Sequence, residues 1–323
     1  MIDILKTGGG IGKKFALIGA LGELQYDTTN LALMDPHFTT LSRMIPKVDH
    51  IFRTDLNVMT ESPYDLYSEF QIHDIEPYND IEFTSRSNNL KNIYLKQIER
   101  ALNIPESNKT KDHINTYKWG KYINVEKIKH NNLLLFQSLD KVKNGKIAVI
   151  ECDNSRHDPT DTRTFTYDNT NKLTSYLLDE GYTIVVLSSI LGTFETIISN
   201  LPFIIEGNLH NPNMGNPKLM FAYDILIMAI ILREYASIFV SIDSHLPHLA
   251  NTSFVRENKE LNGIVFWHNT SPVVFGYPNN INIKPHPDTP NRTFGLPIFD
   301  GYDNSGEQIT REYDIIRYID DKI

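Results

Sequence analysis

The sequence has a single cysteine, few positive charges and no long uninterrupted apolar run. Cys152 can form neither a disulfide within the chain nor a thiolate metal site alone, so we expect a reducing compartment, in the first place the cytoplasm. Lysine and arginine number 31 against 40 aspartates and glutamates, and a net charge of −9 disfavours indiscriminate binding to nucleic acid. The longest apolar stretch, 219–232, is interrupted by Asp224 and is too short to span a membrane, and residues 1–10 lack the apolar run of a signal peptide. The sequence therefore predicts a soluble protein.

The length and the periodicity of the first half predict an α/β domain. The chain has 323 residues, of which 41% are hydrophobic, enough for two separate cores. Residues 54–80 are acidic and aromatic and show no clear period. The segments with a clear pattern are strands at 2–5, 30–34 and 50–52, a glycine turn at 8–12, and helices at 15–24, 39–45 and 89–102.

The second half predicts another α/β domain after a polar linker at 105–115. Its segments are strands at 146–151, 182–187, 203–206, 238–243 and 263–267, and helices at 171–180 and 220–235. We expect two Rossmann-like, doubly wound lobes that face each other across a cleft, with the loops that follow strands along one rim. The predicted boundaries are 1–140 for the first lobe, 141–305 for the second, and 306–323 for a terminal helix that packs back on the first lobe.

The glycine turn at 8–12 matches neither common phosphate-binding motif. A P-loop needs glycine where Thr7 stands and serine or threonine where Lys14 stands. A dinucleotide fingerprint that begins at Gly8 needs glycine at the position of Lys13. Two interpretations remain. The turn at Gly10 and Gly12 lets a ligand approach a helix N-terminus, or it only packs a helix closely on a strand.

A second segment of interest follows the apolar strand at 238–243. The strand ends at Asp243, and Ser244, His245 and Leu246 lead into a short helix that carries His248. Residues at this rim of a doubly wound sheet often hold ligands, and helix amides there favour a diphosphate. The alternative is purely structural: Asp243 and Ser244 only cap the helix, and His248 only satisfies a buried hydrogen bond.

The motifs in these segments, and their order along the chain, resemble those of glycosyltransferase family 9, the ADP-heptose lipopolysaccharide heptosyltransferases. Asp243, Ser244, His248 and Leu249 match the family's strand, Asp-Ser/Thr-Gly and His-Leu signature, whereas His245 replaces its glycine. Further matches are Thr270 and Pro272 of a downstream loop, the first strand and glycine loop around Lys6 and Thr7, and the second helix around 41–48.

The resemblance implies a GT-B enzyme with a nucleotide-sugar donor on the C-terminal lobe and a hydroxyl acceptor, such as a glycan, on the N-terminal lobe. It implies no metal cofactor, and the sequence has no Asp-x-Asp at the end of an apolar strand. A basic phosphate ligand is expected near Arg163, with Arg156 as competitor. The candidate donor-binding residues are Gly10, Gly12, Arg163, Asp243, Ser244, His245, Leu246, His248 and Thr270.

The general base is the main departure from the family. The family has Gly-Asp in the loop after the first strand and its aspartate is the proposed base, but here Lys13 follows the glycine. A lysine cannot take this role at neutral pH without a large fall in pKa, so we expect Lys13 beside the donor phosphate or sugar. The base is then expected from the loop after the second strand, at Asp35 or His37, with His73 and Asp74 in reserve.

Two other functions stay open on the sequence. One is a GT-B transferase that glycosylates a modified base in DNA, for which basic stretches at 91–100 or 109–129 would supply a groove. The other is a catalytically silent protein that binds sugar nucleotides, which the lysine at position 13 and the lost glycines suggest.

Overall fold

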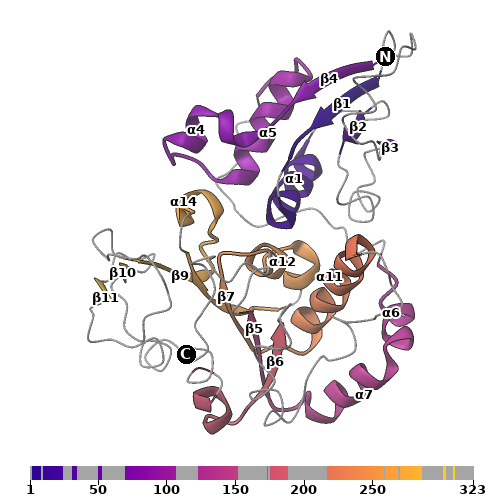
Figure 1. Cartoon of the computed structure of the whole chain (residues 1–323), viewed down its shortest axis with the longest axis vertical. Helices are drawn as coiled ribbons and strands as arrows, with labels where there is room; N and C mark the ends of the chain where they lie inside the picture. Colours follow the sequence, from indigo (N-terminus) through magenta and orange to yellow (C-terminus); the bar gives the residue numbers. More distant parts are fainter. Residues whose placement is uncertain are drawn as a thin grey trace.

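The computed structural model describes residues 2–8, 10–24, 31–34, 50–52, 70–106, 123–151, 173, 175–187, 217–257, 259–267, 270–285, 301–302 and 308–309. These residues form two sheets with flanking helices, and the strands at the centre of each sheet are parallel (Figure 1). The α/β class expected from the sequence is confirmed.

The N-terminal sheet has the strand order β3-β2-β1-β4, and all its neighbouring strands are parallel. The strands are β1 (Ile2–Lys6), β2 (Leu31–Met34), β3 (His50–Phe52) and β4 (Phe70–Asp74). The first three agree with the sequence prediction. β4 falls in the stretch for which no period was found: it is an edge strand on which even Ile72 is 45% exposed, so it needs no apolar pattern.

Two longer helices pack together beside this sheet: α1 (Ile11–Glu23) and α5 (Leu90–Ala101). α5 begins where expected because the Asn89 side chain accepts a hydrogen bond from the amide of Asn92. Between β4 and α5 lie a short 3-10 turn, η2 (Pro77–Asn79), and α4 (Ile81–Thr84). The helix expected at 39–45 lies outside the described residues.

The C-terminal sheet has the order β11-β10-β9-β8-β7-β5-β6, parallel from β6 to β9 and antiparallel at β10 and β11. Its strands are β5 (Lys146–Glu151), β6 (Tyr182–Leu187), β7 (Ile238–Ile242), β8 (Asn262–Phe266), β9 (Asn280–Pro285), β10 (Gly301–Tyr302) and β11 (Gln308–Ile309). β7 is buried along its whole length, which explains its unbroken run of apolar residues.

One prediction for the chain terminus is wrong. Residues 308–309, assigned from the sequence to the start of a terminal helix at 306–323, form β11 and pair with β10. The intervals of Ile309 and later apolar residues suggested a helix, but a two-residue strand carries no period by which the two can be separated. The rest of that segment and the strand expected at 203–206 lie outside the described residues.

The helices of the C-terminal part are α6 (Val125–Asn131), α7 (Leu133–Val142), α11 (Pro217–Glu234), α12 (Leu246–Ala250), α13 (Ser253–Arg256) and α14 (Pro272–Phe275). Residues 173 and 175–179 are helical, as expected. α6 and α7 were not foreseen. Within the described ranges, no helix combines the length and apolar character needed to cross a membrane.

The two parts touch through helices. α1 packs against α12, and Phe83 of α4 meets Phe275 of α14 edge to face, with ring centroids 5.7 Å apart. One cluster of buried apolar side chains extends from α1 and α5 to the C-terminal sheet. Figure 1 shows α12 and α14 on the side of the C-terminal sheet that faces α1 and α4.

Candidate functional site

Side chains from three neighbouring strands meet at the carboxyl edge of the C-terminal sheet. Glu151 ends β5, Asp243 to His245 follow β7, and Thr270 follows β8. β7 lies between β5 and β8, and the three strands are parallel, so their carboxyl ends lie side by side. This is the edge at which open α/β sheets bind ligands.

A hydrogen bond joins the two C-terminal motifs identified in the sequence. The hydroxyl of Thr270 donates to Asp243 Oδ2 at 2.6 Å. Asp243 is only 6% exposed, so this bond fixes the loop after β8 against the loop after β7. The structure therefore brings together Asp243 and Thr270, which are 27 residues apart in the sequence.

Glu151 is the centre of this edge, and the sequence analysis missed it. Its carboxylate is buried and accepts hydrogen bonds from the hydroxyls of Ser241, at 2.9 Å, and Ser244. Its other oxygen lies 3.3 Å from His245 Nδ1. The available signal was a carboxylate at the end of an otherwise apolar strand. Glu151 holds Ser244 and His245 in place, and the Ser244 hydroxyl also accepts from the amide of the buried Leu246 at 3.3 Å.

His248 lies between the two parts of the molecule. It is 4% exposed, its Nδ1 is 2.8 Å from the hydroxyl of Tyr277, and its ring lies against Gly12 of α1. Burial, and to a lesser degree the nearby His245, lowers the pKa of His248 from 6.5 to about 3. The ring is therefore neutral at physiological pH. Its donor-binding role stays a prediction, and the structure gives it a second role in closing the contact between α1 and α12.

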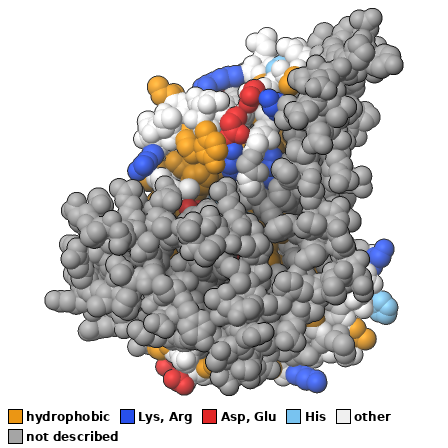
Figure 2. Space-filling model, viewed as in Figure 1, with side chains coloured by type: hydrophobic (Ala, Val, Ile, Leu, Met, Phe, Trp, Pro, Cys, Tyr) orange, Lys and Arg blue, Asp and Glu red, His pale blue; other side chains and the backbone are white. Residues whose placement is uncertain are grey.

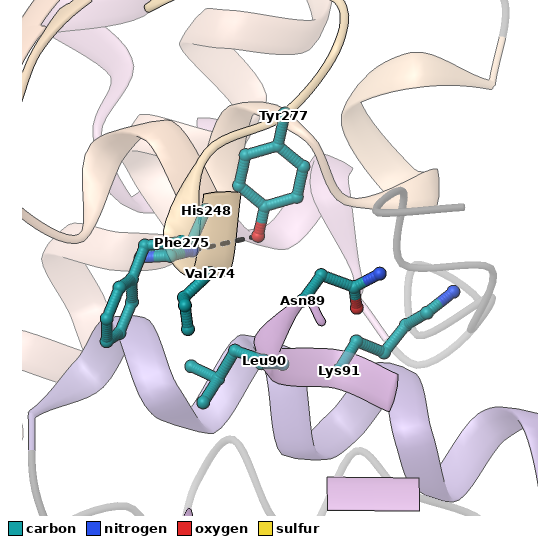
Figure 3. A pocket seen from close by; sticks show the side chains of 8 residues that line it. Asn89, Leu90, Lys91, His248, Val274, Phe275 and Tyr277 are labelled. Carbon is teal, nitrogen blue, oxygen red and sulfur yellow. Dashed lines mark hydrogen bonds between the residues drawn. The ribbon is translucent and has the colours of Figure 1, made fainter. Parts of the chain in front are cut away.

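A narrow crevice runs between these parts beside His248 (Figure 3). The room within it is about 10 Å³, close to what a single water molecule needs. Residues from α1, α5, α12 and α14 and the following loop line it: Ala16, Asn89, Leu90, Lys91, His248, Val274, Phe275 and Tyr277. The crevice is a seam between packed helices, and it is too small for a nucleotide sugar.

The glycine turn carries an ion pair that the sequence did not reveal. Lys13 is 4% exposed, its ammonium pairs with Glu76, and it lies 3.9 Å from the centre of the Tyr78 ring. Burial lowers the pKa of Lys13, while the hydrogen bond and charge of Glu76 oppose that effect. Glu76 also accepts a hydrogen bond from the Gly8 amide at 3.0 Å.

Other predicted residues are placed less centrally or not at all. Asp35, His37, Arg156 and Arg163 lie outside the described residues. His73 Nε2 is 2.8 Å from Asp3 Oδ1, and Asp74 accepts from the Glu76 amide at 3.0 Å. Gly10 is exposed at the start of α1.

The basic stretch at 91–100 does not form a basic groove. Lys91 is 2% exposed and pairs with Glu23, Lys96 pairs with Glu82, and Arg100 pairs with Glu106 and Asp80. In the second stretch, Lys129 pairs with Glu234, and residues 107–122 lie outside the described part of the chain. The described residues also contain no cluster of three histidines, cysteines or carboxylates with the geometry of a metal site.

Comparison with known proteins gives matches only at the level of structure. No protein family model matches the sequence, and no curated protein is significantly similar to it. E. coli heptosyltransferase WaaC, solved with ADP, aligns over 100% of both chains with a TM-score of 0.55 and 12% identity. A Veillonella parvula family 9 glycosyltransferase aligns over 87% of this chain and 86% of its own, with a TM-score of 0.58 and 10% identity. E. coli ADP-heptose lipopolysaccharide heptosyltransferase II aligns over 100% and 97%, with a TM-score of 0.55 and 13% identity.

The chain has the fold of the family 9 heptosyltransferases. This agrees with the resemblance drawn from Asp243, Ser244, His248 and Thr270. At 10–13% identity the likeness concerns the fold alone, so donor, acceptor and chemistry need their own arguments.

Proposed function

We propose that this protein is a glycosyltransferase that moves a sugar from a nucleotide-sugar donor to a hydroxyl group of an acceptor, a glycan in the first place. The observation that carries the proposal is the Asp243–Thr270 hydrogen bond at the carboxyl edge of a sheet with the heptosyltransferase fold. Two segments that resemble the family in sequence are thus in contact at the edge where α/β sheets bind ligands.

In this proposal the molecule is a GT-B enzyme. The part built on β5 to β9 binds the donor, and the part built on β1 to β4 binds the acceptor. The support is that the fold likeness to WaaC extends over the whole chain and therefore includes both sheets.

The proposed donor carries a nucleoside diphosphate, and an ADP-sugar is the first candidate. WaaC has been solved with ADP and with ADP-2-deoxy-2-fluoro heptose, which supports this choice. His245 is proposed to lie beside the diphosphate because Glu151, 3.3 Å from its Nδ1, fixes the ring at this edge and leaves Nε2 on the other side of it. The hydroxyls of Ser244 and Thr270 donate to Glu151 and Asp243 and so hold the loops of this edge in place, and Arg163 is the proposed cation.

The leaving diphosphate is proposed to be neutralised by these side chains without a metal ion. The charge that develops on the diphosphate when its bond to the sugar breaks is then stabilised by Arg163, by the His245 side chain and by backbone amides after β7. Gly10 leaves the entrance to α1 open for the donor, since a Cβ there would meet nothing within 4 Å, and Gly12 lets α1 approach His248, another proposed donor residue.

Ligand binding and product release test this proposal together. Free ADP, UDP, GDP and CMP and their sugar conjugates are screened by thermal unfolding, since a ligand at 100 times its Kd stabilises the folded state by about 2.7 kcal/mol. We expect ADP to stabilise the chain and an ADP-sugar to release ADP, with the rate unchanged by EDTA. His245→Gln weakens ADP binding about 10-fold, because it removes the ring that Glu151 holds beside the proposed diphosphate site.

The matched control is His130→Gln, since His130 is exposed on α6. It leaves ADP binding unchanged. If no nucleotide stabilises the protein, or if EDTA abolishes turnover and magnesium restores it, the proposal is wrong. If an ADP-sugar binds but no acceptor leads to release of ADP, the alternative of a catalytically silent sugar-nucleotide-binding protein is favoured.

A further inference from the structure

A carboxylate from outside the glycine turn lies at the carboxyl edge of the N-terminal sheet. β1 and β4 are neighbours and parallel, so Gly8, two residues after β1, and Glu76, two residues after β4, come to the same edge. The Gly8 amide donates to Glu76 Oε2 at 3.0 Å, and the Lys13 ammonium binds Oε1. Glu76 is thus anchored through both oxygens to the turn that leads into α1.

Lys13 and Glu76 differ in their access to a ligand. The Lys13 side chain is 5% exposed, confined between the Glu76 carboxylate and the Tyr78 ring. The Glu76 side chain is 21% exposed. Each carboxylate oxygen has two lone pairs, so Glu76 can accept one more hydrogen bond from the open side while it keeps its anchors.

The neighbouring titratable groups at this edge are already engaged. His73 faces Asp3, and Asp74 accepts from the Glu76 amide and lies 3.9 Å from Lys6. Figure 2 shows acidic, basic and apolar side chains next to one another on this part of the surface. Tyr78, 50% exposed, adds an apolar ring beside the carboxylate on which a sugar could pack.

We propose that Glu76 is the general base of the transfer reaction and that Lys13 is the residue that positions it. This rests on the proposed glycosyltransferase function. The acceptor hydroxyl gives its proton to Glu76 while its oxygen forms a bond to the anomeric carbon of the donor sugar. The bond from that carbon to the diphosphate oxygen breaks, and its electron pair leaves with the nucleoside diphosphate. Glu76 then returns the proton to water.

This assignment changes the part expected of Lys13. The sequence analysis expected Lys13 beside the donor, but its ammonium is held by Glu76. The ammonium holds Oε1 of the carboxylate and so fixes its orientation. The groups that face the Glu76 carboxylate are the Lys13 ammonium and the Gly8 amide, and Asp74 and Tyr78 lie next to it on its own segment.

The test measures ADP release from ADP-heptose by the full chain, with water and a glycan panel as acceptors. Glu76→Gln keeps the shape of the side chain and an acceptor oxygen for the Gly8 amide but cannot take a proton. We expect turnover to fall by about 10² to 10⁴ with the Kd for ADP within twofold of the wild type. Glu82→Gln is the matched control, because Glu82 is also lysine-paired and its side chain is 28% exposed. It keeps wild-type turnover.

The role of Lys13 is read from the double variant and from rescue by the conservative variant. Lys13→Met removes the ammonium that holds Oε1 of Glu76, so turnover falls while the Kd for ADP stays within twofold of the wild type. Lys13→Arg keeps a cationic donor beside Glu76 and restores most of the turnover. Added to Glu76→Gln, Lys13→Met lowers turnover no further, whereas under a structural role alone the two losses would add.

Failures of the base assignment and of the proposed function give different results. If a folded Glu76→Gln variant releases ADP at the wild-type rate, the assignment of Glu76 is wrong and the glycosyltransferase proposal still stands. A wild-type chain that neither binds ADP nor releases it from ADP-heptose overturns both. If Glu76→Gln unfolds at a lower urea concentration than the wild type, Glu76→Asp provides the second measurement. Wild-type turnover in that shortened variant, together with wild-type turnover in Lys13→Met, also overturns the assignment.

Discussion

Gly12 is fixed as glycine by a side chain from the other end of the sequence. A Cβ at Gly12 would lie 2.5 Å from Cδ2 and 2.8 Å from Nε2 of His248. The ring cannot move aside, since it is buried and lies among Trp267, Phe275 and Tyr277. The sequence offered two interpretations of this glycine, and close packing accounts for it whether or not a donor also approaches.

We predict that Gly12→Ala lowers the free energy of unfolding by about 1–3 kcal/mol, the usual cost of overpacking. In an ordinary helix the same change raises the free energy of unfolding by about 0.5–1 kcal/mol, so a decrease would identify the contact between Gly12 and His248. Urea unfolding measures the effect. Gly10→Ala is the control, since a Cβ there meets nothing within 4 Å. In a His248→Ala background, Gly12→Ala should no longer destabilise, and an unchanged cost in that background would contradict the explanation.

At the scale of the elements, the strands with a buried apolar run were predictable from the sequence. β5, β6, β7 and β8 agree with prediction to within one residue, because central strands of a parallel sheet are buried on both faces. β4, β9, β10 and β11 were missed. β9 (Asn280–Pro285) includes the buried polar side chains Asn280 and Asn282, so it lacks the unbroken apolar run of the other central strands. β4 is an exposed edge strand, and β10 and β11 have two residues each, so none of them needs a hydrophobic period.

The residues of the candidate site divide in the same way, into those that a sequence pattern marks and those that it does not. Asp243 and Ser244 were identified because they directly follow a buried strand, where the pattern ends sharply, and Thr270 was identified through the resemblance to the family. Glu151 was read as the end of a strand and not as a site residue, although it forms the centre of the hydrogen-bonded group. Glu76 had no local signal. It becomes a candidate only through β1–β4 pairing, which brings together residues 68 positions apart.

A second glycine shows how a strand is fitted to its neighbour. Gly263 of β8 lies opposite Phe239 of β7, and a Cβ at Gly263 would lie 2.1 Å from the Phe239 ring. The ring covers the glycine and is fully buried. We predict that Gly263→Ala destabilises the chain by about 1–3 kcal/mol in urea unfolding, and that Phe239→Leu largely relieves the added cost. Additive costs in the double variant would show that the ring and the glycine are not in conflict.

At the scale of the whole molecule, the contact between the two sheets places an ionisable ring where it cannot be solvated. His248 faces the Tyr277 hydroxyl and the edge of α1, and His245 is the nearby titratable group. Burial raises the pKa of Tyr277, so its hydroxyl stays protonated and can donate to Nδ1 of a neutral imidazole. Protonation of His248 would replace this arrangement by a charge in an apolar seam and would disfavour the contact between α1 and α12.

This predicts a loss of stability in mild acid. The pKa of His248 is about 3 in the folded chain and 6.5 for an ordinary, solvated histidine, as in the unfolded chain, so between these limits the unfolded chain binds a proton that the folded chain does not. Stability from this group is complete above pH 6.5 and falls as the pH decreases toward 3. Between pH 6.5 and 5.5 the loss is about 1 kcal/mol, from the linkage relation. Urea unfolding at pH 7.5, 6.5 and 5.5 measures it.

His248→Gln should be less stable at pH 7.5 but should lose about 1 kcal/mol less than the wild type over that interval, whereas the exposed-site variant His130→Gln should keep the wild-type loss. Equal losses in the wild type and His248→Gln would mean that His248 takes up its proton as readily in the folded chain as in the unfolded one, and that the seam between the two sheets is open to water.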